Sequence, residues 1–256
     1  MVSRVVQYLN YRLKAGTRHD VHSPFIYDFV NTFLHEPVTY YAFEPIEAIR
    51  SAMLIKEASV RVKDFGAGSG SGEIKVRDIA QKALLPPKYG QLLFRLVNAF
   101  QPASVVELGT SLGITTLYLS MPSSAIPVFT IEGNEEIAEV AGVNFRRLKR
   151  ENVELLTGEF DIHLGNVIHK IQKAGLVFID GNHRYEPTMK YFQMFREVSD
   201  ENTIMVFDDI YWSREMTKAW KEISGHPQVT LSLDLYRMGV IFFRKGVEKQ
   251  YFRLRY

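Results

Sequence analysis

The feature that most constrains the fold of this chain is a regular alternation of short apolar runs with helical patterns between Ser104 and Phe243. Each run ends in a polar residue or a glycine, which is typical of parallel strands buried on both faces. Such strands are expected at residues 104–108, 128–132, 153–156, 176–180 and 203–208. Because strands that alternate with helices fold into a sheet covered on both faces, the pattern predicts a doubly wound α/β architecture.

The end of this region departs from the alternation. Two β-rich runs, 229–235 and 239–243, are joined only by Tyr236 to Met238. This connection is too short for a parallel crossover, so the two runs should pair as an antiparallel hairpin. The prediction is therefore a seven-stranded, mostly parallel sheet with a C-terminal antiparallel hairpin. The basic tail at 244–255 is expected to be a solvated terminus.

The first hundred residues lack the alternation. Helices are expected around Val5 to Leu13, at residues 23–34 and at residues 89–100. Residues 61–72 are rich in Gly, Ser and charge and are expected to form a loop. We therefore expect a helical extension or lid over residues 1–100 and a ligand-binding domain over residues 101–256.

Composition excludes several classes of protein. Without cysteine the chain has no disulfide, thiolate nucleophile or cysteine-ligated zinc. A balance of 31 basic and 29 acidic side chains argues against a nucleic-acid partner. The longest uncharged stretch, Leu108 to Ile131, is interrupted by Gly and Pro, and the start of the chain lacks the apolar core of a signal peptide. A cytoplasmic protein with no membrane partner is expected.

The turn after the first strand of the alternating region carries the most chemical information. Glu107 lies near the end of that strand, and Gly109 and Gly113 follow in a turn whose backbone can approach a ligand closely. Glu132 ends the next strand, where an acid can accept hydrogen bonds from both ribose hydroxyls. The dinucleotide pattern G-x-G-x-x-G is missing, and a carboxylate just before the turn disfavours phosphate. A ribose-bearing, amine-bearing ligand is therefore favoured over a dinucleotide.

This combination of acid, strand and Gly-x-x-x-Gly turn, with Glu132 and the final hairpin, resembles the class I S-adenosylmethionine-dependent methyltransferases, which have a Rossmann-like fold. The resemblance covers about Ser104 to Phe243 and makes residues 101–256 the cofactor-binding methyltransferase domain. It implies that S-adenosyl-L-methionine is the cofactor. It also implies a set of cofactor contacts, namely Glu107, Gly109, Thr110, Ser111, Gly113, Glu132, Gly133, Gly158, Glu159, Phe160 and Asp180.

A second group of acids follows the fourth and fifth strands of the region. Asp180, Asp208 and Asp209 should emerge at one sheet edge, where carboxylates can share Mg²⁺ or another divalent cation. The pattern is similar to metal-dependent small-molecule O-methyltransferases, although Asp209 stands where the catechol-acting group has asparagine. The sugar-acting group implies His183 as the base, so Asp180 and His183 are the catalytic candidates. Alternatively, Asp208 caps a helix or binds cofactor and Asp180 holds a loop.

Two further segments leave their roles open. Residues 64–70 repeat the acid and glycine pattern, but no second strand ending in an acid follows them, so a loop is expected, with a lid over the cofactor as the alternative. His19 and His22 could face the acceptor pocket, or the segment could be only a turn and a helix cap. Two histidines alone are poor evidence for a metal site.

The function predicted from these motifs is methyl transfer to a hydroxyl oxygen of a small-molecule acceptor, with divalent-metal assistance. Two alternatives stay open: a non-catalytic protein that binds a nucleotide or S-adenosylmethionine, and a nicotinamide-dependent oxidoreductase, which the missing third glycine disfavours. The sequence does not identify the acceptor. It is also compatible with a homo-oligomer.

Overall fold

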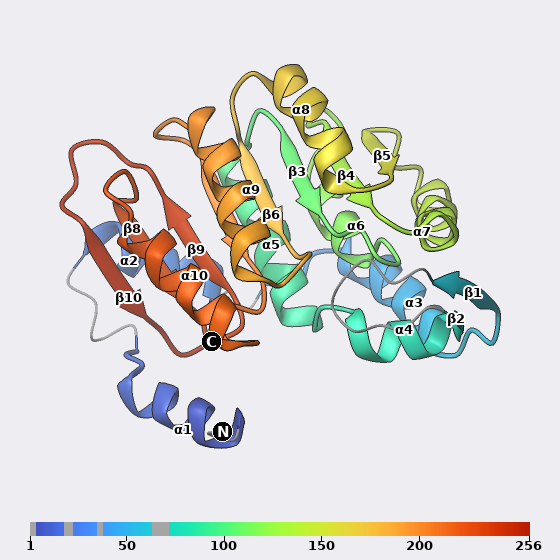
Figure 1. Cartoon of the computed structure of the whole chain (residues 1–256), viewed down its shortest axis with the longest axis horizontal. Helices are drawn as coiled ribbons and strands as arrows, with labels where there is room; N and C mark the ends of the chain where they lie inside the picture. The colour runs from blue at the N-terminus through green and yellow to red at the C-terminus, as the bar shows by residue number, and fades with distance from the viewer. Residues whose placement is uncertain (1–3, 18–22, 35–37, 63–71) are drawn as a thin grey trace. The chain divides into compact units, whose positions relative to one another are not determined.

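The computed structural model describes residues 4–17, 23–34, 38–62 and 72–256 (Figure 1). The glycine-rich residues 64–70 and the pair His19 and His22 therefore lie outside the described residues. The chain divides into two compact units. One comprises residues 38–176, here the 38–176 unit. The other comprises residues 1–37 and 177–256, here the terminal unit.

Three parallel strands form the sheet of the 38–176 unit. They are β3 (Val105–Leu108), β4 (Val128–Glu132) and β5 (Val153–Thr157), with β4 paired to both of the others. Both Val105 and Val106 are buried, which confirms the two-sided burial expected from the apolar run. Since the strands are parallel, their carboxyl ends lie at one edge of this sheet, where the predicted cofactor residues follow them.

Helices connect and cover these strands: α3 (Phe43–Leu54), α4 (Val76–Ala83), α5 (Pro87–Phe100), α6 (Ile114–Ser120), α7 (Glu135–Arg147) and α8 (Phe160–Ile171). Phe43, Phe94 and Tyr118 form an aromatic core among α3, α5 and α6, with centroids 5.0 Å apart for Phe43 and Phe94 and 5.6 Å for Phe43 and Tyr118. The α7 helix begins where the Asn134 side chain accepts a hydrogen bond from the Ile137 backbone N–H, as an N-cap residue should.

A short hairpin was not expected within the predicted loop at residues 61–72. Its strands are β1 (Ser59–Val62) and β2 (Gly72–Lys75), which pair antiparallel. The Arg61 Nε lies 2.6 Å from Glu136 Oε1, and this ion pair joins β1 to the start of α7. The loop prediction is therefore wrong at both ends of the segment, because strand pairing and contacts with α7 order residues that are polar in sequence.

The terminal unit contains β6 (Leu176–Ile179), whose first residue falls at the unit boundary, then β7 (Ile204–Phe207), β8 (Leu231–Asp234), β9 (Gly239–Phe242) and β10 (Gln250–Arg253). The order is β10-β8-β9-β7-β6, and β9 pairs antiparallel with both β7 and β8. The helices are α1 (Arg4–Lys14), α2 (Pro24–Phe29), the π-helical continuation η2 (Val30–Leu34), α9 (Tyr185–Glu197) and α10 (Arg214–Gly225). Figure 1 shows α9 and α10 in front of these strands and α2 behind them.

All seven strands expected from the alternation, including the final hairpin, are present. The prediction of a solvated basic tail at residues 244–255 is wrong, because β10 forms within this segment and pairs in parallel with β8. The reason is a buried carboxylate: Asp234 accepts hydrogen bonds from the Tyr251 hydroxyl and from Arg253 Nε, at 2.7 and 3.2 Å. In the described residues, no helix has both the length and the apolar character needed to cross a bilayer.

Candidate active site

The turn that links β3 to α6 has a tight, left-handed backbone. Its φ angles are +105° at Gly109, +48° at Ser111 and +80° at Gly113. At Gly113 a Cβ atom would lie 2.6 Å from the Phe145 ring, so glycine is required there by both conformation and space. The predicted glycine turn is confirmed as a local structure, and it brings backbone N–H groups to the carboxyl end of β3.

Glu132, at the end of β4, connects this turn to its neighbours. Its Oε2 accepts a hydrogen bond from Ser111 N at 2.8 Å, and its Oε1 accepts one from Asn134 N at 3.0 Å. The backbone carbonyl of Glu132 accepts from Gly158 N at 2.9 Å. Burial raises the pKa of Glu132, although the backbone N–H donors oppose that rise. The Gly133 backbone also donates to this carboxylate, which leaves one of its four lone-pair positions for a hydrogen bond from a ligand hydroxyl.

Glu107 is fully buried on β3, and its two oxygens have different surroundings. Oε2 accepts hydrogen bonds from the hydroxyls of Thr116 and Thr130, at 2.5 and 2.6 Å. The Thr110 hydroxyl lies 2.6 Å from that of Thr130, so three threonines form one network with the acid. Oε1 is buried and has no hydrogen-bond partner in the described part of the chain. Burial raises the pKa of Glu107 to about 8.

The remaining candidates of this unit follow β4 and β5. Gly133 comes directly after Glu132, and Gly158 has a φ of +137° that few other residues adopt. Glu159 is exposed at the N-cap position of α8 and makes no capping hydrogen bond, while Phe160 is half-buried at the first position of that helix. These residues thus lie beside the Glu132 network at the edge where all three strands end.

These residues fit S-adenosylmethionine, the cofactor that the resemblance implies. The buried, unpartnered Oε1 of Glu107 is a polar atom in need of a donor, such as the amine of that molecule. Two acids near the turn also suit a cationic ligand better than a phosphate. Glu107 and Glu132 would therefore hold the polar groups of the cofactor, and the glycine turn would let it approach the backbone.

The terminal unit holds the predicted catalytic pair. Asp180 and His183 lie in the segment between β6 and α9, with His183 Nε2 3.5 Å from Asp180 Oδ1, and the two side chains are 18% and 21% exposed. Asn182 between them has a φ of +62°, and its amide donates to the Tyr191 hydroxyl. A residue in this sparsely populated conformation holds the segment in one shape, which is common at functional sites.

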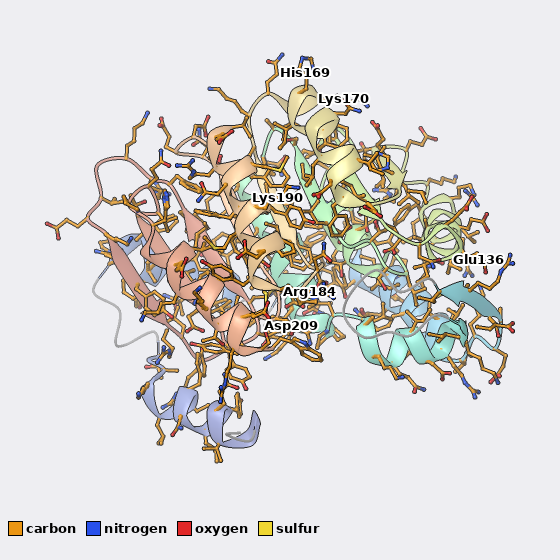
Figure 2. All side chains as sticks on the ribbon, viewed as in Figure 1. Glu136, His169, Lys170, Arg184, Lys190 and Asp209 are labelled. Atoms are coloured by element: carbon orange, nitrogen blue, oxygen red, sulfur yellow. The ribbon has the colours of Figure 1, made fainter. Side chains whose placement is uncertain are left out.

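Asp208 and Asp209 follow β7, where the sequence places them, but their main partner is a residue that the sequence analysis did not identify. Arg237 Nε donates to both oxygens of the fully buried Asp208 carboxylate, and Nη2 donates to Oδ2 at 2.9 Å. Arg237 Nε also lies 3.8 Å from Asp209 Oδ1. Burial raises the pKa of Asp208, and the Arg237 guanidinium opposes that rise. Figure 2 labels both Asp209 and Arg184, the residue that immediately precedes α9.

The predicted metal set, Asp180, Asp208 and Asp209, does not fit a divalent cation in this geometry. Both oxygens of Asp208 are taken by the guanidinium of Arg237, which is also attracted by Asp180 and Asp209. Among the described residues, no three His, Asp or Glu side chains gather closely enough to hold a metal ion. The charge of the carboxylates is balanced by the Arg237 guanidinium instead.

Comparison with protein families identifies the class. Residues 106–210 match the family model described as a methyltransferase domain. The match begins in β3 and ends just after Asp209, so it includes the glycine turn, Glu132, Asp180 and His183. This stretch is similar to a methyltransferase domain, which confirms the resemblance to S-adenosylmethionine-dependent methyltransferases expected from the sequence.

Individual proteins are similar to the chain either in sequence or in fold. A transmembrane O-methyltransferase homolog of Mus musculus is 33% identical over 106 residues, which are 39% of this chain and 40% of that protein. The chain thus spans about two fifths of the length of this curated relative. An S-adenosylhomocysteine-bound methyltransferase of Podospora anserina aligns over 88% of this chain and 98% of its own, with a TM-score of 0.59 and 14% identity. An O-methyltransferase of Bacillus cereus in complex with S-adenosylhomocysteine aligns over 85% of this chain and 97% of its own, with a TM-score of 0.56 and 18% identity. At such identities the structures show a shared fold.

Three residues of the site region escaped the sequence analysis. Besides Arg237, Asn144 of α7 donates to the Leu112 carbonyl at 2.9 Å and so fixes the glycine turn, and Thr130 of β4 bonds to Glu107. Arg237 could have been found from the sequence, because a lone arginine between two buried apolar strands needs a negatively charged partner. Asn144 and Thr130 carried no comparable signal.

Proposed function

We propose that this protein is an S-adenosylmethionine-dependent methyltransferase that methylates a hydroxyl oxygen of a small molecule. The observation that carries the proposal is the network around Glu132, which joins the ends of β3, β4 and β5 within the matched methyltransferase domain. The cofactor supplies an electrophilic methyl group on a sulfonium. The protein must bind the cofactor and the acceptor, align them, remove the proton of the acceptor hydroxyl and exclude water.

In this proposal the 38–176 unit binds the cofactor. Glu132 accepts hydrogen bonds from its ribose, and Glu107 Oε1 accepts one from its amine. The glycine turn provides the close approach. This assignment extends to the other predicted contacts in that unit, Gly109, Thr110, Ser111, Gly113, Gly133, Gly158, Glu159 and Phe160, of which Thr110 acts through its bond to Thr130 rather than directly.

His183 is the proposed general base. Its Nε2 faces Asp180, which leaves Nδ1 to accept the proton of the acceptor hydroxyl. When bound, the cofactor would supply the methyl group, and its sulfur would keep the electron pair of the carbon–sulfur bond. Asp180 holds the imidazole in place and stabilises its charged form. Arg237 would favour the negative charge that develops on the oxygen, since a guanidinium remains protonated throughout.

Two binding measurements separate this proposal from its alternatives. Calorimetry with the full chain should show saturable binding of S-adenosylmethionine and S-adenosylhomocysteine, and none of NAD. If the chain binds NAD and does not bind S-adenosylmethionine, the nicotinamide-dependent oxidoreductase is favoured. Binding of S-adenosylmethionine without transfer of a labelled methyl group to any member of a hydroxyl-compound library would favour the non-catalytic binding protein.

The role of His183 has a separate test once an acceptor is identified. His183→Asn should lower kcat by about a hundredfold or more, since general base catalysis typically contributes that much. The affinity for S-adenosylmethionine should stay within twofold. The matched control is His169→Asn on the exposed face of α8 (Figure 2), which should leave kcat unchanged. An unchanged kcat for His183→Asn would remove the assignment.

A further inference from the structure

A cavity of about 1000 Å³ lies within the terminal unit, between α1, the start of α10 and β10. Its lining includes Tyr11, Lys14, Tyr211, Trp212, Arg214 and Arg253. Pockets that hold small organic molecules have about this volume. None of the lining residues belongs to the predicted cofactor, catalytic or metal sets, so the cavity is unexplained by the proposed function.

The walls of the cavity are aromatic and firmly held. The Tyr211 hydroxyl donates to the buried Asp234 carboxylate at 2.7 Å, and its ring stacks on Tyr236 with centroids 5.3 Å apart. The Tyr11 ring packs edge to face against Tyr211 at 6.0 Å. Trp212, by contrast, is 51% exposed. A planar ligand would therefore find rigid aromatic surfaces and an indole beside them, which bind rings at little entropic cost.

The charge around the cavity is positive. Lys14, Arg214 and Arg253 line it, and no Asp or Glu is among its lining residues. Arg253 is neutralised by Asp234, with Nε 3.2 Å from Oδ2. Lys14 and Arg214 are exposed and form no ion pair with any described residue. Two cations are thus left without compensation at the mouth of an aromatic cavity.

We propose that this cavity is a binding site for a small aromatic anion, whose ring packs against Tyr11, Tyr211 and Trp212 while its acidic group meets Lys14 and Arg214. A neutral ring would use the walls but leave both cations unpaired. A small inorganic anion would use the cations but leave the aromatic walls in water. Only a molecule with both parts matches everything that the cavity presents.

The test uses the full chain and a matched pair of probes, 2-naphthoate and the neutral 2-naphthamide, which share one ring system and nearly one size. Calorimetry should show 2-naphthoate binding at least tenfold more tightly than 2-naphthamide at low salt. The difference should shrink as salt rises, because exposed charges are screened. Emission from Trp212 should be quenched on binding, whereas Trp220 is only 3% exposed and should not respond.

Charge removal at the mouth gives the decisive comparison. Lys14→Gln with Arg214→Gln should weaken 2-naphthoate binding at least fivefold and leave 2-naphthamide unchanged. Lys218→Gln with Lys221→Gln removes the same charge from α10 outside the cavity and should change neither by more than twofold. Equal binding of the two probes, no saturable binding of 2-naphthoate, or an equal loss in both double variants would overturn the proposal. All four positions are exposed, so both variants should fold.

Discussion

Arg237 donates hydrogen bonds to both carboxylate oxygens of Asp208, although 28 residues separate them in the chain. The strand register brings them together, because Phe207 of β7 is paired with Gly239 of β9. The residue after β7 therefore lies beside the turn that precedes β9. This pair takes the place that the sequence suggested for a divalent cation, and it stabilises a carboxylate that is 0% exposed.

Removing one member of this pair should be costly. Arg237→Met leaves the Asp208 charge buried without a partner, and breaking such a pair typically costs about 3–5 kcal/mol of unfolding free energy. Urea denaturation of the variant measures this cost. A matched control is Arg147→Met on the exposed face of α7, which should change stability by less than about 0.5 kcal/mol.

The double variant Arg237→Met with Asp208→Asn distinguishes a charge effect from lost packing. Removing the buried charge as well should recover more than half of the loss caused by Arg237→Met alone. If the double variant is as unstable as the sum of the two single variants, the ion pair is not the source of the cost.

The glycine turn gives a second prediction. Gly113→Ala places a methyl group 2.6 Å from the Phe145 ring at a φ of +80°. The left-handed backbone costs about 1–2 kcal/mol for alanine and overpacking adds about 1–3 kcal/mol, so thermal unfolding should show a loss of about 2–5 kcal/mol. Gly165→Ala is the control, because its Cβ would meet nothing within 4 Å on α8 and should stabilise the helix by about 0.5–1 kcal/mol.

Glu107 predicts a pH dependence of stability for the ligand-free protein. Its folded pKa of about 8 lies above the ordinary value of 4.5, so below pH 4.5 the carboxyl is protonated in both states. As pH rises to about 8 the unfolded chain releases the proton first, and stability is lost by at most about 5 kcal/mol. Glu107→Gln cannot ionise, so its unfolding free energy should fall less steeply over this window. Glu135→Gln, which is exposed, should follow the parent; a Glu107→Gln curve parallel to the parent would contradict the prediction.

Glu132 predicts a loss of cofactor affinity. Glu132→Gln keeps the shape of the side chain but replaces one acceptor oxygen by a donor, which conflicts with the N–H group of either Ser111 or Asn134. Calorimetry should show S-adenosylmethionine binding at least tenfold weaker, with Glu135→Gln unchanged as the control. Full affinity in Glu132→Gln would show that the residue only supports the turn.

Local sequence patterns predicted most of the strands and helices. The apolar runs identified all seven strands of the alternating region, because burial on both faces leaves a continuous signature in a few consecutive residues. The glycines at 109 and 113 marked the turn because left-handed backbone favours glycine. Helix α1 was also expected, with Leu9 and Leu13 on its apolar face, yet these two side chains are 54% and 82% exposed. Tyr11 is buried instead, and its hydroxyl donates to the backbone carbonyls of Asp234 and Leu254.

The sequence by itself therefore determined the order of strands and helices, the glycine turn and the acids that follow each strand, since each of these depends on neighbours in the chain. Tertiary structure decided how charges are paired. The partners of Asp208 and Asp234 lie far from them in sequence, and only strand register brings Arg237 and Arg253 to them. A buried carboxylate must be matched by some donor, but its sequence position does not say which residue supplies it, and this choice replaced an expected metal cluster with an arginine.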